Sequence, residues 1–326
     1  MMSSPNPNPT SLLFLLIIFS IASFKLSYCI NFCPEIEKQS LLSFKQSLED
    51  PDNTLSSWNI NGEVNCCKWK GVACNNYTGH VHKLYLQSYY LSGKLNPSLL
   101  NLKHLRYLDL SQNYFEETIP SFIGSFQGLE YLDLSLSGFN GTIPHTIGNL
   151  SSLRTLCLGY TETYEINHLK VDSFEWLSGL SQLEQLNMNG VNLSAVATTW
   201  VQVINTLSSL VELNFSSCSL NFIAPLNDFV NVSSLAFLDL SQNEFQSSVI
   251  PKWIFQLSEL TYLDLSVSNL EGPIPNISNI TKLQWIDLSS NNLNSAIPDW
   301  LYFNRDLKLV DLQECDLHGV LTILLQ

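Results

Sequence analysis

Four cysteines close to the amino terminus are the residues with the clearest capacity for chemistry: Cys33, Cys66, Cys67 and Cys74. Such a group either pairs as disulfides or binds zinc through its thiolates. The spacing fits no usual zinc pattern, so we favour disulfides and expect no metal. Four cysteines allow three pairings. A bridge between the adjacent Cys66 and Cys67 would be strained, and we expect the pairs Cys33–Cys66 and Cys67–Cys74.

Two histidines, His80 and His82, form an H-x-H pair that places both imidazoles on one side of an extended strand. This is half of a metal site, and no third ligand is apparent nearby. The sequence also has no glycine-rich phosphate loop and no G-x-S-x-G nucleophile motif. We therefore expect a protein that is not an enzyme, with no catalytic residues, no bound metal and no cofactor.

The amino-terminal segment predicts export. Residues 12–22, LLFLLIIFSIA, are an apolar run that is shorter than the roughly 20 residues of a bilayer span. The run and the small residues up to Cys29 are typical of a cleaved signal peptide over 1–29, with an uncleaved anchor as the alternative. Export also favours oxidised cysteines.

Eight N-x-[ST] sequons are typical of an exported glycoprotein. They are Asn76, Asn140, Asn149, Asn192, Asn214, Asn231, Asn276 and Asn279. Asn214 belongs to a predicted strand, where a glycan would block ligand contact. We expect either that Asn214 is unmodified or that the ligand binds elsewhere.

Self-similarity dominates the rest of the chain. The pattern L-x-x-L-x-L-x-x-N-x-L recurs ten times, at intervals of 23 to 30 residues. Its central strand residues are Leu84, Leu108, Leu132, Leu156, Leu186, Leu213, Leu238, Leu263, Ile286 and Val310. One coil cannot bury its own leucines, whereas stacked coils bury them against each other. We predict an α/β solenoid, a leucine-rich-repeat right-handed superhelix with a parallel sheet on its concave face.

The outward strand positions carry two kinds of side chain, because alternate strand residues face away from the core. Aspartates form either a structural ladder with nearby serines or a surface for a basic ligand: Asp109, Asp133, Asp239, Asp264, Asp287 and Asp311. Aromatic residues are either ligand anchors or sheet-stabilising neighbours. These candidate ligand-binding residues are Tyr85, Tyr107, Tyr131, Phe237, Tyr262 and Trp285.

Three further regions complete the expected organisation. A disulfide-bonded cap over 30–80 begins with a helix from Glu35 to Leu48 and seals the first coil with Trp58 and Trp69. About ten repeats fill 81–326, and L-x-G-x-I-P segments such as 139–144 shape the convex side into turns and short helical pieces. The longer repeat at 159–181 predicts either packing of Phe174, Trp176 and Leu177 or a loop at the binding site.

Three other cysteines fall on consensus positions of the repeat. Cys218 and Cys315 occupy the asparagine position of the pattern, and we interpret both as structural. Cys157 takes the place of an outward aspartate. It is either a free, exposed thiol or a small residue without a particular role.

The net charge is −14, and no run of Lys or Arg is present. This excludes nucleic acid as a partner, since nucleic-acid binding needs clustered positive charge. The acidity favours attraction of a basic partner.

Several motifs carry a family resemblance. The sequence CCKWKGVAC at 66–74, followed by TGHV at 78–81, resembles the plant-type leucine-rich-repeat amino-terminal domain. The L-x-G-x-I-P repeats are similar to the plant-specific class. The stretches 169–180 and 201–207 resemble plant receptor-like proteins of the fungal-xylanase receptor group. The resemblance extends from Cys33 to His318.

The resemblance implies a cell-surface receptor without a kinase, which binds an extracellular protein or peptide, microbial or endogenous, and signals in defence through partner receptor kinases. The family's cap supports the disulfide pairing above. Family members usually have more repeats, a carboxy-terminal cap and a membrane helix, so we expect a truncated product or partial gene model. The location implied is the outer face of the plasma membrane, or the apoplast if the chain is complete. The alternative is a secreted polygalacturonase-inhibitor-like protein or soluble decoy.

Overall fold

The computed structural model describes residues 32–159, 169–226, 230–246, 248–275, 280–300 and 304–318. The expected signal peptide and the sequons Asn276 and Asn279 lie outside the described residues.

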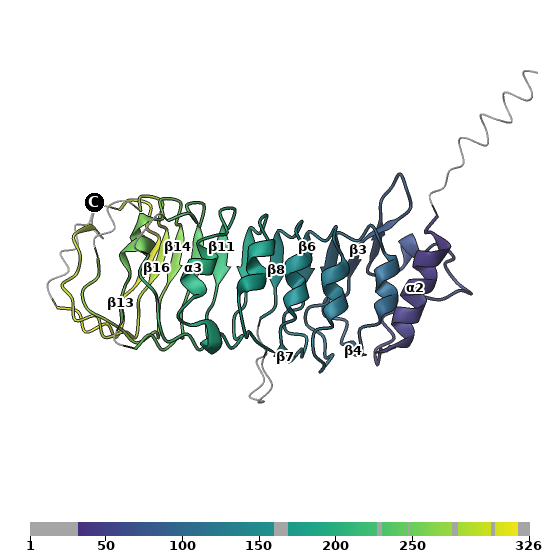
Figure 1. The fold of residues 1–326 in the computed structure, drawn as a ribbon, viewed down its shortest axis with the longest axis horizontal. Coiled ribbons are helices and arrows are strands. Elements are labelled where there is room, and N and C mark those ends of the chain that lie inside the picture. The colour runs from purple at the N-terminus through teal and green to yellow at the C-terminus, as the bar shows by residue number, and fades with distance from the viewer. Residues whose placement is uncertain are drawn as a thin grey trace, which may run out of the picture.

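A long sheet runs the length of the molecule, with its strands side by side and short helical turns on the opposite side (Figure 1). Ten of its eleven strands are parallel and follow the chain order, and β2 pairs antiparallel with β3 at the edge next to the cap. The strands are β2 (Val72–Cys74), β3 (Val81–Tyr85), β5 (Tyr107–Asp109), β6 (Tyr131–Asp133), β8 (Thr155–Cys157), β10 (Gln185–Asn187), β11 (Glu212–Asn214), β12 (Phe237–Asp239), β14 (Tyr262–Asp264), β16 (Trp285–Asp287) and β17 (Leu309–Asp311).

The register confirms the predicted repeat. All ten predicted strand residues lie in the ten parallel strands and pair with one another in order, as Leu84 does with Leu108 and Leu108 with Leu132. Nine of them are buried, and Val310 in β17 is 39% exposed. Each coil therefore buries its leucines against the next coil, as a solenoid requires.

The opposite side consists of short helical pieces, as predicted. They are η2 (Pro97–Asn101), η3 (Ser121–Ser125), η4 (His145–Asn149), η5 (Glu175–Gly179), η6 (Ser194–Val196), α3 (Trp200–Ile204) and η7 (Lys252–Gln256). Glycine is required where these turns touch: a Cβ on Gly148 would lie 2.4 Å from the Trp176 carbonyl oxygen. Phe174, Trp176 and Leu177 are buried around η5, which agrees with the packing interpretation of the longer repeat. Residues 160–168 lie outside the described part.

Short two-stranded sheets flank the long one, a feature that the sequence did not predict. They pair β1 (Leu48–Glu49) with β4 (Ser92–Gly93), β7 (Gly141–Thr142) with β9 (Leu169–Lys170), and β13 (Ser248–Val249) with β15 (Leu270–Glu271). The first of these joins the cap to the repeats. It also shortens the cap helix, because α2 (Glu35–Gln46) ends before Leu48, which was expected to be helical.

Buried asparagines join successive coils where the strands turn away. Asn113 Nδ2 donates to the carbonyls of Leu86 and Leu110, both at 2.8 Å, and its Oδ1 accepts from Leu91 N at 2.9 Å. Asn243 and Asn291 repeat this arrangement. A buried carbonyl without a partner is costly, so one amide that satisfies two coils ties them together.

The cysteines at this position have structural surroundings, as predicted. Cys218 Sγ lies 3.1 Å from the Met188 carbonyl oxygen, and Cys315 Sγ lies 2.9 Å from that of Leu288. Both side chains are buried, so each packs between coils in the place of an asparagine.

The cap closes the amino-terminal end of the solenoid (Figure 1). Its disulfides join Cys33 to Cys66, at the start of η1 (Cys66–Lys68), and Cys67 to Cys74, which is the pairing that we expected. Trp58 and Trp69 are buried and stack at 5.8 Å between ring centroids. Both indoles donate to backbone carbonyls, so their polar atoms are satisfied as the rings cover the first coil.

A buried carboxylate connects the cap helix to the first repeat strand. Glu37 in α2 is 2% exposed and lies 2.7 Å from His80 Nδ1, while its other oxygen accepts from Val81 N at 2.7 Å. The His80 ring also packs 4.1 Å from that of His104. His80 is thus a structural partner, and His82 is a half-buried neighbour whose pKa is lowered by burial and by Lys83 and Arg106.

We predict that Glu37→Ala destabilises the cap, because it leaves the buried Val81 N–H and the His80 ring without their acceptor. The expected loss in free energy of unfolding is about 2 kcal/mol. Urea denaturation of the secreted chain, followed by near-ultraviolet circular dichroism of the cap tryptophans, measures it.

Gln39→Ala in the same helix is the matched control, because Gln39 is exposed and its amide donates to the exposed Glu35 side chain. Its expected change stays within about 0.5 kcal/mol. Equal losses in the two variants would contradict the role given to Glu37.

Candidate functional site: the outward face of the sheet

Two rows of side chains face outward along the sheet, one on each side of the buried central residues. The first row is Lys83, Tyr107, Tyr131, Thr155, Gln185, Glu212, Phe237, Tyr262, Trp285 and Leu309. The second row is Tyr85, Asp109, Asp133, Cys157, Asn187, Asn214, Asp239, Asp264, Asp287 and Asp311. Parallel in-register strands therefore turn a sequence repeat into two continuous ladders of neighbours.

The six candidate aromatic residues form two separate ladders. In the N-terminal ladder, Tyr85, Tyr107 and Tyr131 have centroid distances of 4.6 and 4.0 Å between successive rings. The C-terminal ladder is built from Phe237, Tyr262 and Trp285, with distances of 4.2 and 5.7 Å. The sequence alone does not separate these six residues into groups. The pairing of the strands does so, because β8, β10 and β11 lie between the two ladders.

Ring stacking is one function of these ladders. The planes of Tyr107 and Tyr131 differ by 5°, and those of Phe237 and Tyr262 by 9°. Such cross-strand pairs stabilise a sheet, so the stacking interpretation has direct support. Tyr85 and Trp285 at the outer ends remain 37% and 38% exposed. That any of the six aromatic residues also contacts a ligand is a proposal.

The second-row aspartates are held by the serine two residues later. Asp133 Oδ1 accepts from Ser135 N at 2.9 Å and from Ser135 Oγ at 2.6 Å, and Asp239 makes the same pair with Ser241. Asp109 was expected to face outward, but Asp109 and its partner Ser111 are only 5% and 1% exposed. The row therefore has a structural function, since its carboxylates stabilise each turn.

Electrostatics make the aspartate row a poor place for additional negative charge. Burial raises the pKa of Asp133, with a further contribution from the charge of Asp109. Burial also raises the pKa of Asp239, to which Asp264 and Asp287 contribute. None of the ion pairs formed among the described residues includes a second-row aspartate. The row attracts cations.

Three strands between the ladders carry polar side chains and no aromatic ring. We call Thr155, Gln185, Glu212, Asn187 and Asn214 the polar middle, and sequence analysis did not select it as a site. Thr155 Oγ1 donates to Gln185 Oε1 at 2.9 Å. Asn187 and Asn214 keep the local bond of the aspartates, with each Oδ1 3.0 Å from the backbone nitrogen two residues later. The sequence does contain a sign of this region, because the outward aromatic residues are missing from three consecutive repeats.

Cys157 lies in the second row next to the polar middle. Cys157 is a free thiol, as one of the two interpretations expected, but it is half-buried and not fully exposed. Burial, with the charges of Asp133, Asp109 and Glu212, raises its pKa to about 12. The thiol is therefore protonated near neutral pH and is a weak nucleophile.

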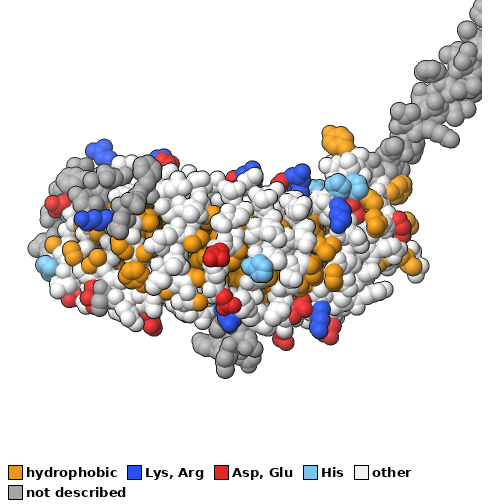
Figure 2. Space-filling view, in the orientation of Figure 1, with side chains coloured by type: hydrophobic (Ala, Val, Ile, Leu, Met, Phe, Trp, Pro, Cys, Tyr) orange, Lys and Arg blue, Asp and Glu red, His pale blue; other side chains and the backbone are white. Residues whose placement is uncertain are grey.

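The rim beside the first row pairs its cations. Arg106 forms an ion pair with Glu130, and Arg154 forms one with Glu184. On the face seen in Figure 2, charged side chains of both signs are scattered and lie mostly along the long edges.

The described sequons are spread over the surface. Asn76 lies in the cap and Asn149 at the end of η4, while Asn192, which bridges to Lys170, and Asn231 are exposed. Asn140 is half-buried and bridges to Thr118. Asn214 lies in β11 on the outward face, as predicted, and glycan occupancy remains a prediction for all of them.

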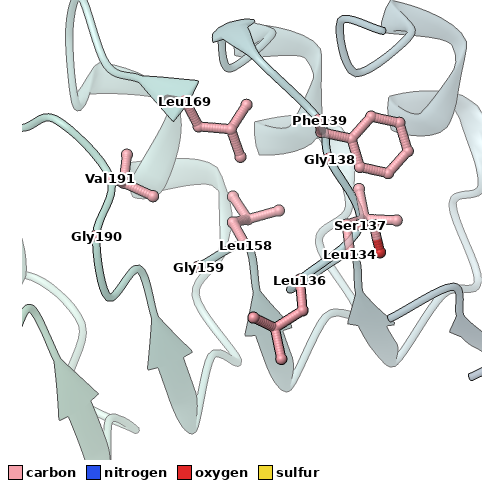
Figure 3. Close-up of a pocket in the computed structure, with 10 residues that line it drawn as sticks. All are labelled: Leu134, Leu136, Ser137, Gly138, Phe139, Leu158, Gly159, Leu169, Gly190 and Val191. Atoms are coloured by element: carbon pink, nitrogen blue, oxygen red, sulfur yellow. The ribbon is translucent and has the colours of Figure 1, made fainter. Parts of the chain in front are cut away.

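A small cavity lies between three successive repeats, behind the sheet (Figure 3). Its walls are mostly apolar and include Leu134, Leu158 and Val191. The cavity volume of about 20 Å³ is room for one water molecule. It is too small for a ligand, and the outward face of the sheet is the candidate because of the exposed aromatic rings that it carries.

In the part of the chain that the structure describes, no helix combines the length and apolar character needed to cross a membrane.

Two family models match this chain. The one described as "Leucine-rich repeat region" matches residues 65–322, and the one described as "Leucine rich repeat N-terminal domain" matches residues 35–75. The first covers most of the chain.

Curated relatives are plant receptor-like proteins. The chain is 41% identical to Receptor-like protein EIX1 of Solanum lycopersicum, over 79% of this chain and 26% of that protein. It is 38% identical to Receptor-like protein EIX2 of the same species, over 81% and 26%. Receptor-like protein Cf-9 of Solanum pimpinellifolium is 34% identical, over 83% and 33%. The chain therefore spans about a quarter to a third of the length of these relatives.

Solved structures with the same fold include two Arabidopsis receptor-kinase ectodomains. That of HAESA, in complex with an IDA peptide hormone, has a TM-score of 0.61 and 28% identity, over 86% of this chain and 41% of that one. That of GASSHO1/SCHENGEN3, in complex with CASPARIAN STRIP INTEGRITY FACTOR 2, has a TM-score of 0.67 and 26% identity, over 86% and 36%.

We predict that the stability of the Asp133→Asn variant, relative to that of the wild type, increases as the pH rises. The folded pKa of Asp133 is raised above the ordinary value of 3.8, so the stability linked to its proton is present at low pH. That stability is lost as the pH rises through the folded pKa. The gain in Tm over the wild type is therefore expected to grow from about pH 4 to about pH 7. The variant creates a sequon, so a host without N-glycosylation is used.

Asp50→Asn is the control with the opposite sign. Burial alone would raise the pKa of Asp50, but bonds from Leu55 N, Thr54 N and the Thr54 hydroxyl, with the charge of Lys45, lower it below 3.8. Its stabilising contribution is present at neutral pH and lost as the pH falls through the folded pKa. The Asp50→Asn deficit should shrink on acidification, and the same pH trend in both variants would contradict the account.

Proposed function

The chain belongs to the leucine-rich-repeat family and is a relative of the plant receptor-like proteins, and from this we propose that it is the ligand-recognition region of a plant cell-surface receptor. The resemblance seen in the sequence is thereby confirmed at the level of the family. The ligand in this proposal is an extracellular protein or peptide, and signalling passes through partner receptor kinases in defence. A microbial source for the ligand is part of the proposal.

One observation carries the proposal: a continuous outward face of ten parallel strands on which aromatic rings alternate with acidic and amide groups. Exposed aromatic residues are the usual anchors of protein interfaces. Two relatives of known structure, at 28% and 26% identity, are named as complexes with a peptide hormone and with an integrity factor. The same fold therefore holds such ligands in those proteins.

Recognition without catalysis fits the groups on this face. The second-row carboxylates are bonded to serines, and the Cys157 thiol is protonated near neutral pH. Neither arrangement activates a nucleophile. The relatives are receptor-like proteins, which supports binding as the activity of this region.

The organisation that accompanies this function is also proposed. Residues 1–29 direct export, 30–80 form the cap, and 81–326 form the repeats. The two disulfides suit an oxidising extracellular location. We place the chain on the outer face of the plasma membrane on the basis of its relatives.

We predict that ligand contact is confined to the outward face of the sheet. A photo-reactive amino acid is introduced at Tyr107 or Tyr262, and the chain is produced in a plant secretory host. The probes are concentrated plant extracellular fluid and fungal culture filtrate. Irradiation should give discrete adducts from both positions.

Gln127 and Gln256 are the matched control positions, because both are exposed on the side of the helical turns. They should give no adduct from the same fluids. Adducts from these positions alone, or equally from all four, would mean that the sheet is not the recognition surface.

A further inference from the structure

The two aromatic ladders stop at a defined distance from each other. Tyr131 pairs in register with Thr155, then follow Gln185, Glu212 and Phe237 on successive strands. Four steps of about 4.8 Å separate the inner rings, which is roughly 19 Å along the sheet. The spacing is fixed by backbone hydrogen bonds and does not depend on side-chain flexibility.

The inner ends of both ladders present aromatic surface toward the polar middle. Tyr131 stacks on Tyr107 on one side, and its neighbour on the other side is Thr155. Phe237 stacks on Tyr262, and its other neighbour is Glu212. Each inner ring thus has one face that is not covered by another ring of its ladder. The inner ends of the two ladders therefore lie at opposite ends of the polar middle.

The amides between these rings present donors rather than acceptors. Gln185 Oε1 accepts from Thr155, and the Oδ1 atoms of Asn187 and Asn214 accept from backbone nitrogens. The three oxygens are therefore engaged, while the three NH₂ groups have no protein partner among the described interactions. Adjacent free NH₂ groups match the carbonyl oxygens of an extended chain laid across the strands.

The same region carries negative charge without a counter-charge. Glu212 is exposed and has no ion pair among the described residues, whereas the nearest first-row cation, Lys83, lies over the tyrosines of the N-terminal ladder. Arg154 on the rim is engaged with Glu184. Asp133 and Asp239 flank the polar middle in the second row. A ligand that carries positive charge is therefore attracted to this region.

We infer that the site takes an extended basic peptide segment with two apolar anchors. One anchor packs on Tyr131, the other on Phe237, and a Lys or Arg between them meets Glu212. An extended chain rises about 3.3 Å per residue, so the anchors are about five to seven residues apart. This inference rests on the proposed function and names the class of its ligand.

The inference requires Asn214 without a glycan. A sugar on Nδ2 would leave that nitrogen a single N–H and fill the space between the ladders. Asn76 and Asn149 are exposed away from this face, so their occupancy has no bearing on it.

The test uses the full secreted chain and a library of twelve-residue synthetic peptides. Each peptide holds two phenylalanines at separations of three to nine residues, with Lys, Gln or Glu between them. We expect the tightest binding at separations of five to seven with Lys. Tyr131→Thr and Phe237→Gln should each weaken these peptides about tenfold or more. Glu212→Gln should remove the preference for Lys over Gln.

The substituted side chains are compatible with the strand geometry, because Thr155 and Gln185 already occupy the same row. Tyr114→Ser is the control, since Tyr114 is a 56% exposed aromatic residue outside the two rows. It should leave peptide affinity unchanged.

Peptide binding without a preferred separation, or binding that survives both ladder variants, would overturn the two-anchor inference and leave the receptor function standing. So would glycopeptide mass spectrometry that finds Asn214 mostly occupied. If no peptide binds, the photo-crosslinking adducts decide: adducts on the sheet refute only the peptide class, and their absence refutes the proposed function as well.

Discussion

Burial of each coil by its neighbour is the constraint on which the rest of this structure depends. A coil of about two dozen residues cannot enclose its own leucines, so nine of the ten central strand residues are buried by neighbouring coils or by the cap. The buried asparagines reinforce this contact, because one side chain satisfies carbonyls of two successive coils. The first coil has no preceding neighbour, and the disulfide-bonded cap with its two tryptophans takes that place.

Stacking in register also determines what the outward face can be. Any residue type that recurs at one strand position becomes a ladder with neighbours about 4.8 Å apart. The aspartates gain serine partners in their own turns, and the aromatic residues gain each other. The aspartate row and the two aromatic ladders therefore all stabilise the sheet. We propose that specific recognition takes place between the two aromatic ladders, where the amide NH₂ groups have no protein partner among the described interactions.

The sequence predicted the features that depend on periodicity. The strand centres, the short helical pieces and the structural roles of Cys218 and Cys315 follow from consensus positions. It did not predict the Glu37 contact with His80, because the two residues lie on different elements and no periodicity relates them. The burial of Asp109 and the two-stranded flanking sheets also depend on how coils pack. The polar middle has no motif of its own in the sequence, because its residues become neighbours only through the register of β8, β10 and β11.

A structure of the secreted chain bound to its tightest two-anchor peptide tests the central claim most directly. The account predicts an extended peptide that crosses β8, β10 and β11, with one apolar side chain on Tyr131, the other on Phe237 and a basic side chain beside Glu212. A peptide on the side of the helical turns, or one held by a single ladder, would contradict it.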